Sequence, residues 1–288
     1  MWYNSVVNRR SLRIEGWNMA LKLSIRENMA PGRTLLEKFQ NLRELGFDGI
    51  ELTTSSDLSK LDEIKEAMKK TGIQPSITSA RGGALLDARK EERDLAVQKH
   101  KEALTLAAEI GAVGVLSVPL IAVKMGGRPR IPDLSPLAKT EELERKLLVE
   151  LYREICEHAE KVGAYLIIEP LNRYEQWWPN TLADAVSICK EVGHPNCRIM
   201  ADLFHMNIEE VDMAESIRQA GDYIVNVHLA DSNRLTPGHG HTDFKSVFRA
   251  LKDIGYSYFC ALECGIPGDR MAELKRTVEY LRKIYDEA

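Results

Sequence analysis

The chain has 288 residues, 44% of them hydrophobic and 28% charged, which is typical of a soluble globular protein. Its formal net charge of −4 gives nonspecific nucleic-acid binding no overall electrostatic support, so we expect no nucleic-acid partner. Its apolar stretches are strand-length, well short of the ~20 residues that span a bilayer, and we expect no membrane partner either.

The cysteines and the N-terminal segment bear on location. The cysteines number five, which is odd, and show no CxxC spacing. This pattern favours a reduced, cytoplasmic protein with no disulfide framework or thiolate metal site. Residues 1–18 contain Arg9, Arg10 and Arg13 but no long apolar core, so they make a poor secretory signal. We interpret residues 1–18 as a short N-terminal extension and residues 19–288 as a single domain.

From residue 21 onward, short apolar runs alternate with longer amphipathic stretches. Most of the runs are nearly continuously apolar, as expected of strands buried on both faces. They comprise residues 21–24, 49–52, 74–78, 113–118, 165–170, 198–201, 224–229 and 258–262. The amphipathic stretches have helical spacing, and several stop at a glycine that suits a helix C-terminus, namely Gly46, Gly111, Gly163 and Gly255.

This repeated alternation of strand and helix predicts a parallel (β/α)₈ barrel, the TIM-barrel fold, as one α/β domain. Such a barrel needs roughly 250 residues, which would use nearly all of the chain. The alternative is an open doubly wound sheet, but no GxGxxG sequence follows the first strand. In a barrel, catalytic groups lie at the C-terminal ends of the strands and in the loops that follow them.

Four consecutive predicted strands each end with a residue that can bind a metal. These residues are Glu169, Asp202, His228 and Glu263. Ionisable groups so close to buried strands are unfavourable unless they are paired or bound to metal, and three clustered carboxylates would repel one another. Mixed oxygen and nitrogen ligands suit Mn²⁺, Mg²⁺ or Co²⁺. We therefore predict a site for one divalent metal at this end of the barrel.

Other candidate residues have structural explanations of similar or greater weight. Glu51, at the end of the second strand, is interpreted as a helix cap or ion-pair partner. Trp177 and Trp178 either stack on a sugar ring or pack against the fold. The basic loop 124–130 is interpreted as solvated rather than as a binding site for an anionic substrate. The loop 237–243 is expected to turn tightly through its glycines and to cap the next helix with its final aspartate.

Several of these segments resemble a known family. The segments are Glu-Pro-Leu-Asn-Arg-Tyr-Glu at 169–175, Asp-Leu-Phe-His-Met-Asn-Ile-Glu-Glu at 202–210, His-Leu-Ala-Asp-Ser-Asn-Arg at 228–234, Pro-Gly-His-Gly at 237–240, and Glu263. Together they resemble the xylose isomerase-like sugar isomerase/epimerase superfamily, and most of all its D-tagatose (D-psicose, or allulose) 3-epimerase group.

The resemblance implies a role for each residue of the site. It implies a divalent metal, above all Mn²⁺, on Glu169, Asp202, His228 and Glu263. It implies that Glu175, His205 and Arg234 hold the oxygens of a small sugar, and that Glu169 and Glu263 are also the catalytic acid–base pair. It also suggests a homo-oligomer, either a dimer or a tetramer.

The implied reaction is proton transfer on a sugar through an enediolate, giving a ketose 3-epimerase. Two regions depart from the group and leave the substrate open: residues 264–269 after the last strand, and the third and fourth strand ends at 79–83 and 118–120. A related sugar or keto-acid isomerase or lyase on the same metal core, resembling hydroxypyruvate isomerase or inosose dehydratase, is the alternative.

A DNA-repair nuclease resembling endonuclease IV is a more remote alternative. That family uses a three-metal cluster with extra histidines at the ends of its third and fourth strands. The corresponding segments here contain no histidine, and the net charge is negative.

Overall fold

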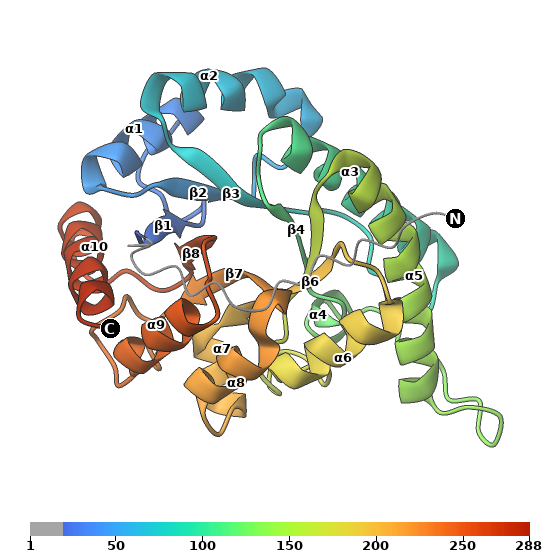
Figure 1. Cartoon of the computed structure of the whole chain (residues 1–288). Coiled ribbons are helices and arrows are strands. Elements are labelled where there is room, and N and C mark those ends of the chain that lie inside the picture. Colours follow the sequence, from blue (N-terminus) through green and yellow to red (C-terminus); the bar gives the residue numbers. More distant parts are fainter. Residues whose placement is uncertain (1–19) are drawn as a thin grey trace, which may run out of the picture.

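The computed structural model describes residues 20–288 and shows eight parallel strands in one sheet that curls into a barrel (Figure 1). The strands are β1 (Lys22–Ile25), β2 (Gly49–Leu52), β3 (Gln74–Ser79), β4 (Gly114–Ser117), β5 (Tyr165–Ile168), β6 (Cys197–Asp202), β7 (Ile224–Leu229) and β8 (Phe259–Leu262). Their order, β1-β8-β7-β6-β5-β4-β3-β2, follows the chain around the ring. The predicted single TIM-barrel domain is confirmed.

The ring closes between β1 and β2 through a few backbone contacts rather than a full ladder. Arg26, which follows β1, forms a parallel bridge with Glu51 of β2. The Asp48 amide donates to Leu23 O and the Glu27 amide donates to Glu51 O, each at 2.8 Å. This closure brings the end of β2 into the same rim as the ends of β7 and β8.

Helices surround the barrel (Figure 1). The longer ones are α1 (Leu35–Leu45), α2 (Leu61–Thr71), α3 (Lys90–Glu109), α5 (Thr140–Val162), α6 (Leu182–Val192), α8 (Met213–Ala220), α9 (Phe244–Asp253) and α10 (Arg270–Asp286). Two short helices, α4 (Ile121–Lys124) and α7 (Leu203–Glu209), lie in the loops after β4 and β6, and η1 (Leu58–Lys60) and η2 (Gly221–Tyr223) are 3₁₀ turns.

The predicted helix ends are confirmed where they depend on glycine. Gly46 and Gly163 cap α1 and α5 in the left-handed conformation, with φ of 84° and 79°. A side chain at these positions would be strained, which explains why each helix stops there.

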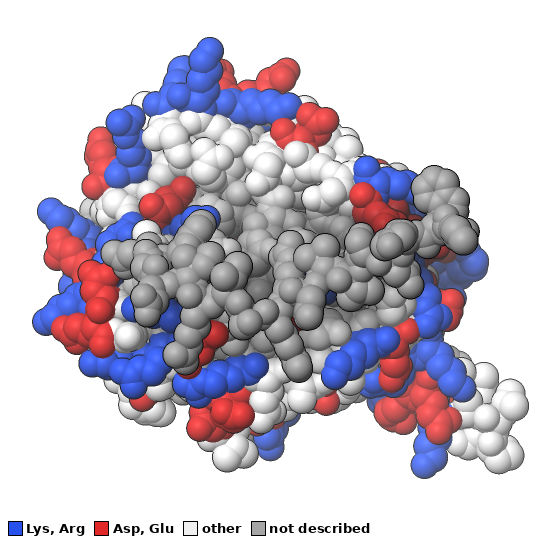
Figure 2. Space-filling model, viewed as in Figure 1, with Lys and Arg blue, Asp and Glu red and all other residues white. Residues whose placement is uncertain are grey.

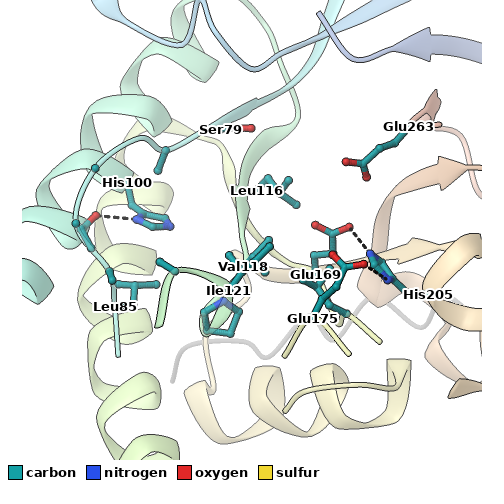
Figure 3. A pocket seen from close by; sticks show the side chains of 18 of the residues that line it. Ser79, Leu85, His100, Leu116, Val118, Ile121, Glu169, Glu175, His205 and Glu263 are labelled. Carbon is teal, nitrogen blue, oxygen red and sulfur yellow. Dashed lines mark hydrogen bonds and ion pairs between the residues drawn. The ribbon is translucent and has the colours of Figure 1, made fainter. Parts of the chain in front are cut away.

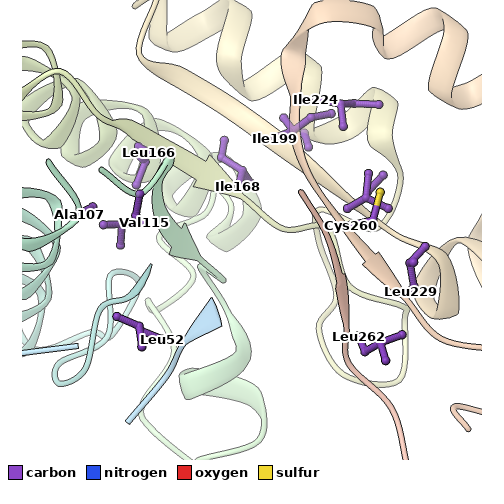
Figure 4. Packing of buried hydrophobic residues seen from close by; sticks show 14 of the residues in the cluster. Leu52, Ala107, Val115, Leu166, Ile168, Ile199, Ile224, Leu229, Cys260 and Leu262 are labelled. Atoms are coloured by element: carbon purple, nitrogen blue, oxygen red, sulfur yellow. The ribbon is translucent and has the colours of Figure 1, made fainter. Parts of the chain in front are cut away.

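The strands are buried on both faces. Side chains such as Leu52, Val115, Leu166 and Ile168 pack against the helices in the main core cluster (Figure 4). Residues between them, including Ile167 and Met200, belong to a smaller cluster inside the barrel. The two-residue period of a strand therefore continues into the polar residues at the strand ends. Glu169 lies two positions after Ile167, and Asp202 lies two positions after Met200. This strand period therefore points both side chains toward the barrel axis.

The predicted N-terminal extension, residues 1–18, lies outside the described residues, and the domain boundary at residue 19 stays a prediction. Within residues 20–288, none of the helices combines the length and apolar character needed to cross a bilayer. On the face seen in Figure 2, the described Lys and Arg side chains are interspersed with Asp and Glu.

Candidate active site

The four predicted metal ligands converge at the C-terminal mouth of the barrel. Glu169 follows β5, Asp202 ends β6, His228 lies near the end of β7 and Glu263 follows β8. His228 is in register with Asp202 on one side and with Ala261 on the other. One ligand atom from each of the four residues lies within 4.8 Å of the others. The geometry is that of a candidate metal site, and the ligand roles themselves stay a prediction.

The centre of this cluster is suited to a cation. His228 Nδ1 lies 2.8 Å from Glu263 Oε2, 3.3 Å from Asp202 Oδ2 and 3.5 Å from Glu169 Oε1. His228 Nδ1 and Glu169 Oε1 are both buried, and neither makes a hydrogen bond of good geometry. Buried polar atoms without partners are unfavourable, and three carboxylates around one point repel one another. A divalent cation would resolve both problems, so the residues fit the predicted metal.

Glu51 determines which nitrogen of His228 faces the cluster. Its Oε2 lies 2.8 Å from His228 Nε2, and both side chains are fully buried. Because a carboxylate accepts, Nε2 carries a proton, which leaves Nδ1 as the nitrogen that would bind a metal held by the other three ligands. Metal-bound histidines are usually oriented in this way. The ion-pair role expected of Glu51 from the sequence is confirmed, and its partners are Arg26 and the candidate ligand His228.

The pKa values of this pair depend on the charges around them. Burial alone would raise the pKa of Glu51, but the nearby His228 and Arg26 lower it. Burial alone would lower the pKa of His228, but Glu51, Asp202 and Glu169 raise it well above its usual value. A cation among the carboxylates acts against protonation of His228, because it replaces the proton as the positive charge they surround.

Arg26 is a residue of the site that the sequence analysis missed. It follows β1, its Nε lies 3.2 Å from Glu51 Oε1, and its Nη1 contacts Glu263 Oε1. It therefore connects the candidate ligand Glu263 to the carboxylate that orients His228. The only feature of the sequence that could have indicated this role is the position of Arg26 directly after a strand. A lone arginine at a strand end has no partner that the sequence alone can identify.

The three predicted substrate residues also lie together. Arg234 Nη1 donates to Glu175 Oε1 at 2.8 Å, and Asn172 Nδ2 donates to the same oxygen at 3.0 Å. Asn172 also donates to His205 Nδ1, from Nδ2 at 2.7 Å and from its backbone amide at 3.2 Å. His205 therefore carries its proton on Nε2, which lies 4.0 Å from Glu169 Oε1. Asn172 belongs to the 169–175 segment but was not singled out from the sequence.

Arg234 is held by its backbone and by a neighbouring ring. It has φ of 59°, a left-handed conformation that is unusual for a residue other than glycine. Its guanidinium lies 4.6 Å from the centre of the Phe204 ring, and its Nη2 lies 3.9 Å from Glu263 Oε1. These contacts direct the planar group toward the candidate ligands.

A cavity of about 300 Å³ opens beside these groups. Its polar lining comprises Arg26, Ser79, His100, Glu169, Glu175, His205, Arg234 and Glu263. Figure 3 shows Glu169, Glu175 and His205 close together, with Glu263 on the other side of the same space. Asp202 and His228 are buried and do not line it, with exposed fractions of 1% and 0%. A ligand in the cavity would therefore contact Glu169 and Glu263 but not the other two candidate ligands.

The loop 237–243 does turn tightly, as the sequence analysis expected. Buried Asp231 accepts from the backbone amides of Ser232, Gly238 and Thr242 at 2.8–3.0 Å. A Cβ on Gly240 would lie 2.4 Å from Asp231 Oδ1, so only glycine fits there. The side chain of Asp243 caps α9, also as expected.

Neither tryptophan lines the cavity. Trp177 donates to Glu144 Oε2 at 3.1 Å, and Trp178 lies beside the guanidinium of Arg145. They pack on α5, which is the second of the two alternatives left open by the sequence analysis.

The basic loop is largely exposed, as the sequence analysis expected, and its charged side chains also pair within the protein. Arg130 pairs with Glu144 at 2.8 Å, Arg128 contacts Glu92, and Lys124 donates to a backbone carbonyl at 2.7 Å. These side chains bind the protein itself and do not line the cavity.

A family model described as the xylose isomerase-like TIM barrel matches residues 39–284. The chain belongs to this family. Among its relatives in the family, 3-dehydro-D-guloside 4-epimerase of Escherichia coli is 32% identical over 247 residues, which cover 84% of this chain and 91% of the relative. D-psicose 3-epimerase of Ruminiclostridium cellulolyticum is 31% identical over 229 residues, covering 78% and 76%.

The same family likeness is found among solved structures. The apo form of E. coli 3-keto-D-glucoside 4-epimerase superposes with a TM-score of 0.81 at 27% identity, covering 91% of this chain and 99% of that one. These named xylose isomerase-like relatives are sugar epimerases, which confirms the prediction of an enzyme.

Proposed function

We propose that this chain is a divalent-metal-dependent sugar epimerase that moves a proton on the carbon beside a carbonyl, with ketose 3-epimerisation as its expected activity. One observation carries the proposal. Glu169 and Glu263 reach the same cavity from β5 and β8, while His228 and Asp202 complete the candidate metal site behind them. The epimerase names of the family relatives support the reaction class.

The residues that would hold the metal are Glu169, Asp202, His228 and Glu263. A divalent metal there would supply a Lewis acid that polarises the carbonyl and makes the neighbouring C–H more acidic. The identity of the metal is part of the proposal, with Mn²⁺ first and Mg²⁺ or Co²⁺ as alternatives, since all three accept this mixture of oxygen and nitrogen ligands.

The proton transfers belong to the two cavity-facing carboxylates. One of Glu169 and Glu263 removes the proton from one face of the carbon, which leaves an enediolate on the sugar. The other returns a proton to the opposite face, which inverts the centre. The two side chains suit this division because they come from strands on different sides of the cavity (Figure 3).

The remaining polar groups hold the sugar. His205 Nε2–H and the Arg234 guanidinium are donors at the same end of the cavity, and they stabilise negative charge that develops on the sugar oxygens. Glu175 accepts from sugar hydroxyls and keeps Arg234 in place through their 2.8 Å contact. The substrate is thus a small sugar.

Cytoplasmic location and homo-oligomerisation stay predictions.

The alternative chemistry uses the same groups. If the site instead removes the proton from C1 of a ketose and returns it to C2, the product is an aldose. If a leaving group lies β to the carbanion, the product is that of a lyase. The nuclease alternative lacks support, because among residues 20–288 the cluster suited to a metal comprises only the four residues named above.

The test is turnover with the stereochemistry read directly. Metal would be removed by chelation and Mn²⁺ or Co²⁺ added back, and D-fructose, D-tagatose and D-psicose would be followed by NMR in D₂O. We expect activity only with metal and deuterium at C3 of the new epimer. An aldose or a dehydrated product would favour the alternatives, and full activity without metal would refute the metal requirement.

A further inference from the structure

The hydroxyl of Ser79 is a polar group of the cavity that the proposed reaction does not use. Ser79 ends β3, and its Oγ is buried without a hydrogen-bond partner among residues 20–288. The residue nevertheless lines the cavity, and in Figure 3 it lies across that space from Glu175 and His205. Most buried hydroxyls in proteins have a partner, so this one calls for an explanation.

The strand determines where this hydroxyl lies. Ile77, two positions before Ser79, belongs to the cluster inside the barrel, and so does Leu116 of β4, which is in register with Ser79. Side chains two positions apart share one face of a strand, so Ser79 points to the inside of the barrel. Its backbone amide donates to Ser56 Oγ at 3.4 Å. The backbone is thus fixed without using the hydroxyl.

The wall of the cavity around Ser79 is otherwise poor in hydrogen-bonding side chains. His100 is the other polar residue there, but its Nδ1 donates to Ala96 O at 2.7 Å and its Nε2 accepts from Ser117 Oγ at 3.1 Å. Burial lowers the pKa of His100, which keeps the ring neutral. The remaining side chains of this wall are apolar and include Ala84, Leu85, Leu116, Val118 and Ile121. In such surroundings a hydrogen bond to Ser79 is strong and a missing one is unfavourable.

Thr53 provides a comparison at the end of the neighbouring strand. It follows β2, and its hydroxyl is also buried without a partner in the described part of the chain. Thr53 does not line the cavity, however. Of these two hydroxyls, only that of Ser79 can therefore meet a ligand.

A ketohexose has hydroxyls that the proposed reaction leaves without assigned partners. The reaction involves C2 and C3, whereas C4, C5 and C6 carry further oxygens. Glu175, His205 and Arg234 act on one side of the cavity, so a sugar that fills it also presents oxygens to the side that Ser79 lines. A serine hydroxyl both donates and accepts, and it can pair with any sugar hydroxyl within reach.

We propose that Ser79 is a specificity residue, whose hydroxyl binds a hydroxyl that the sugar carries at C4, C5 or C6. A site of this kind rejects a sugar that lacks the hydroxyl, because its own buried polar group then stays unpaired. The inference rests on the proposed function, since the reacting carbons must lie between Glu169 and Glu263. It gives a role to the end of β3, where the resemblance assigns none.

The test compares D-fructose with its 4-deoxy, 5-deoxy and 6-deoxy analogues, each titrated calorimetrically into the Mn²⁺-loaded protein. The analogue that lacks the partner of Ser79 should bind wild type roughly 5- to 100-fold more weakly than D-fructose does. In Ser79→Ala, the ratio of the two Kd values for that analogue should fall to about one, while the other two ratios stay at their wild-type values.

Thr53→Val is the matched control, because it removes a buried hydroxyl that does not line the cavity and should keep all three wild-type ratios. Three wild-type ratios that persist in Ser79→Ala overturn the proposal. A ratio that is lost in Thr53→Val as well overturns it too, since the effect is then not specific to Ser79. Failure of D-fructose to bind wild type has the same consequence.

Thermal unfolding distinguishes a binding role from a structural one. Without sugar, the Ser79 hydroxyl has no partner to lose, so Ser79→Ala should unfold at the wild-type temperature or above it. A clearly lower unfolding temperature would show that the hydroxyl supports the fold, which overturns the assignment.

Solvent-deuterium exchange on D-fructose separates this proposal from the proposed function. Kd ratios that Ser79→Ala leaves unchanged, with C3 exchange intact in wild type, overturn the role of Ser79 and leave the epimerase standing. A ratio lost only in Ser79→Ala, with no C3 exchange in wild type, supports the role of Ser79 and overturns the proton transfer.

Discussion

His228 donates its Nε2–H to Glu51 across a distance of 2.8 Å, although 177 positions separate the two residues in the chain. The bond joins the end of β7 to the end of β2, and both side chains are fully buried. It orients His228 so that Nδ1 faces Glu169, Asp202 and Glu263. The fit of the candidate site to a metal therefore depends on a residue that is not itself a candidate ligand.

Replacing Glu51 should weaken metal binding without removing a ligand. Glu51→Gln keeps the size and an acceptor oxygen but loses the charge that fixes the His228 tautomer, so we expect roughly 10- to 100-fold lower Mn²⁺ affinity. Calorimetric titration of metal-free protein measures this. Glu109→Gln, at an exposed carboxylate on α3, is the matched control. Unchanged affinity in Glu51→Gln would show that the contact does not support the site.

Arg234 is predicted to act on substrate rather than on metal. Arg234→Ala removes a charged donor, whose hydrogen bond contributes about 1.5–3 kcal/mol, so KM should rise roughly 10- to 100-fold while metal content stays at the wild-type level. Arg234→Lys should not rescue KM, because the planar fork of donors is lost. Steady-state kinetics and elemental analysis of the same samples test both statements. A variant that loses its metal would show that the assignment is wrong.

Substitution of Glu169 and substitution of Glu263 should affect different proton-transfer steps. Glutamine at either position keeps an oxygen ligand but removes the base, so each variant should lose about 10²- to 10⁴-fold in kcat and retain some metal. In D₂O, one variant should still exchange the C3 proton of one epimer, and the other variant that of the opposite epimer. NMR of each epimer incubated separately reads this directly. Loss of exchange for both epimers in both metal-bound variants would refute the two-base mechanism.

Glu27 should contribute to stability in a pH-dependent way. It is 2% exposed and accepts from the backbone amides of Thr53, Thr54 and Ser55 at 2.8–3.1 Å, which orders the loop after β2. Burial acts to raise its pKa, but these bonds and those from the Thr54 and Ser55 hydroxyls outweigh burial and lower the pKa to about 2.

A pKa that is lower in the folded state than in the unfolded state stabilises the protein above the unfolded value, and this stabilisation is lost as pH falls toward the folded value. Glu27→Gln should therefore lower the free energy of unfolding by about 2–3 kcal/mol at pH 7. The difference from wild type should shrink as pH falls from about 4.5 toward 2. Urea unfolding between pH 7 and pH 3 measures it, with exposed Glu44→Gln on α1 as the control. A difference that is independent of pH would contradict the ionic explanation.

The strand-end residues show how far the sequence alone could predict the site. Glu169 and Asp202 each lie two positions beyond an apolar residue that points into the barrel, so the period of the strand places them on the axis. No long-range contact is needed for that inference. The Trp177–Trp178 pair shows the opposite case, since its partners Glu144 and Arg145 lie on α5, and sequence spacing alone left packing and sugar stacking equally possible.

The sequence by itself determined the repeated strands and helices, the glycines that end helices, and the four strand-end residues that meet at the candidate metal site. Each depends on local periodicity or on a residue's place within its own strand. Only the tertiary structure decided that Arg26 and Glu51 join the site. These contacts arise where β2 closes against β1. Contacts between segments distant in the chain form only when the ring closes, and no local pattern encodes them.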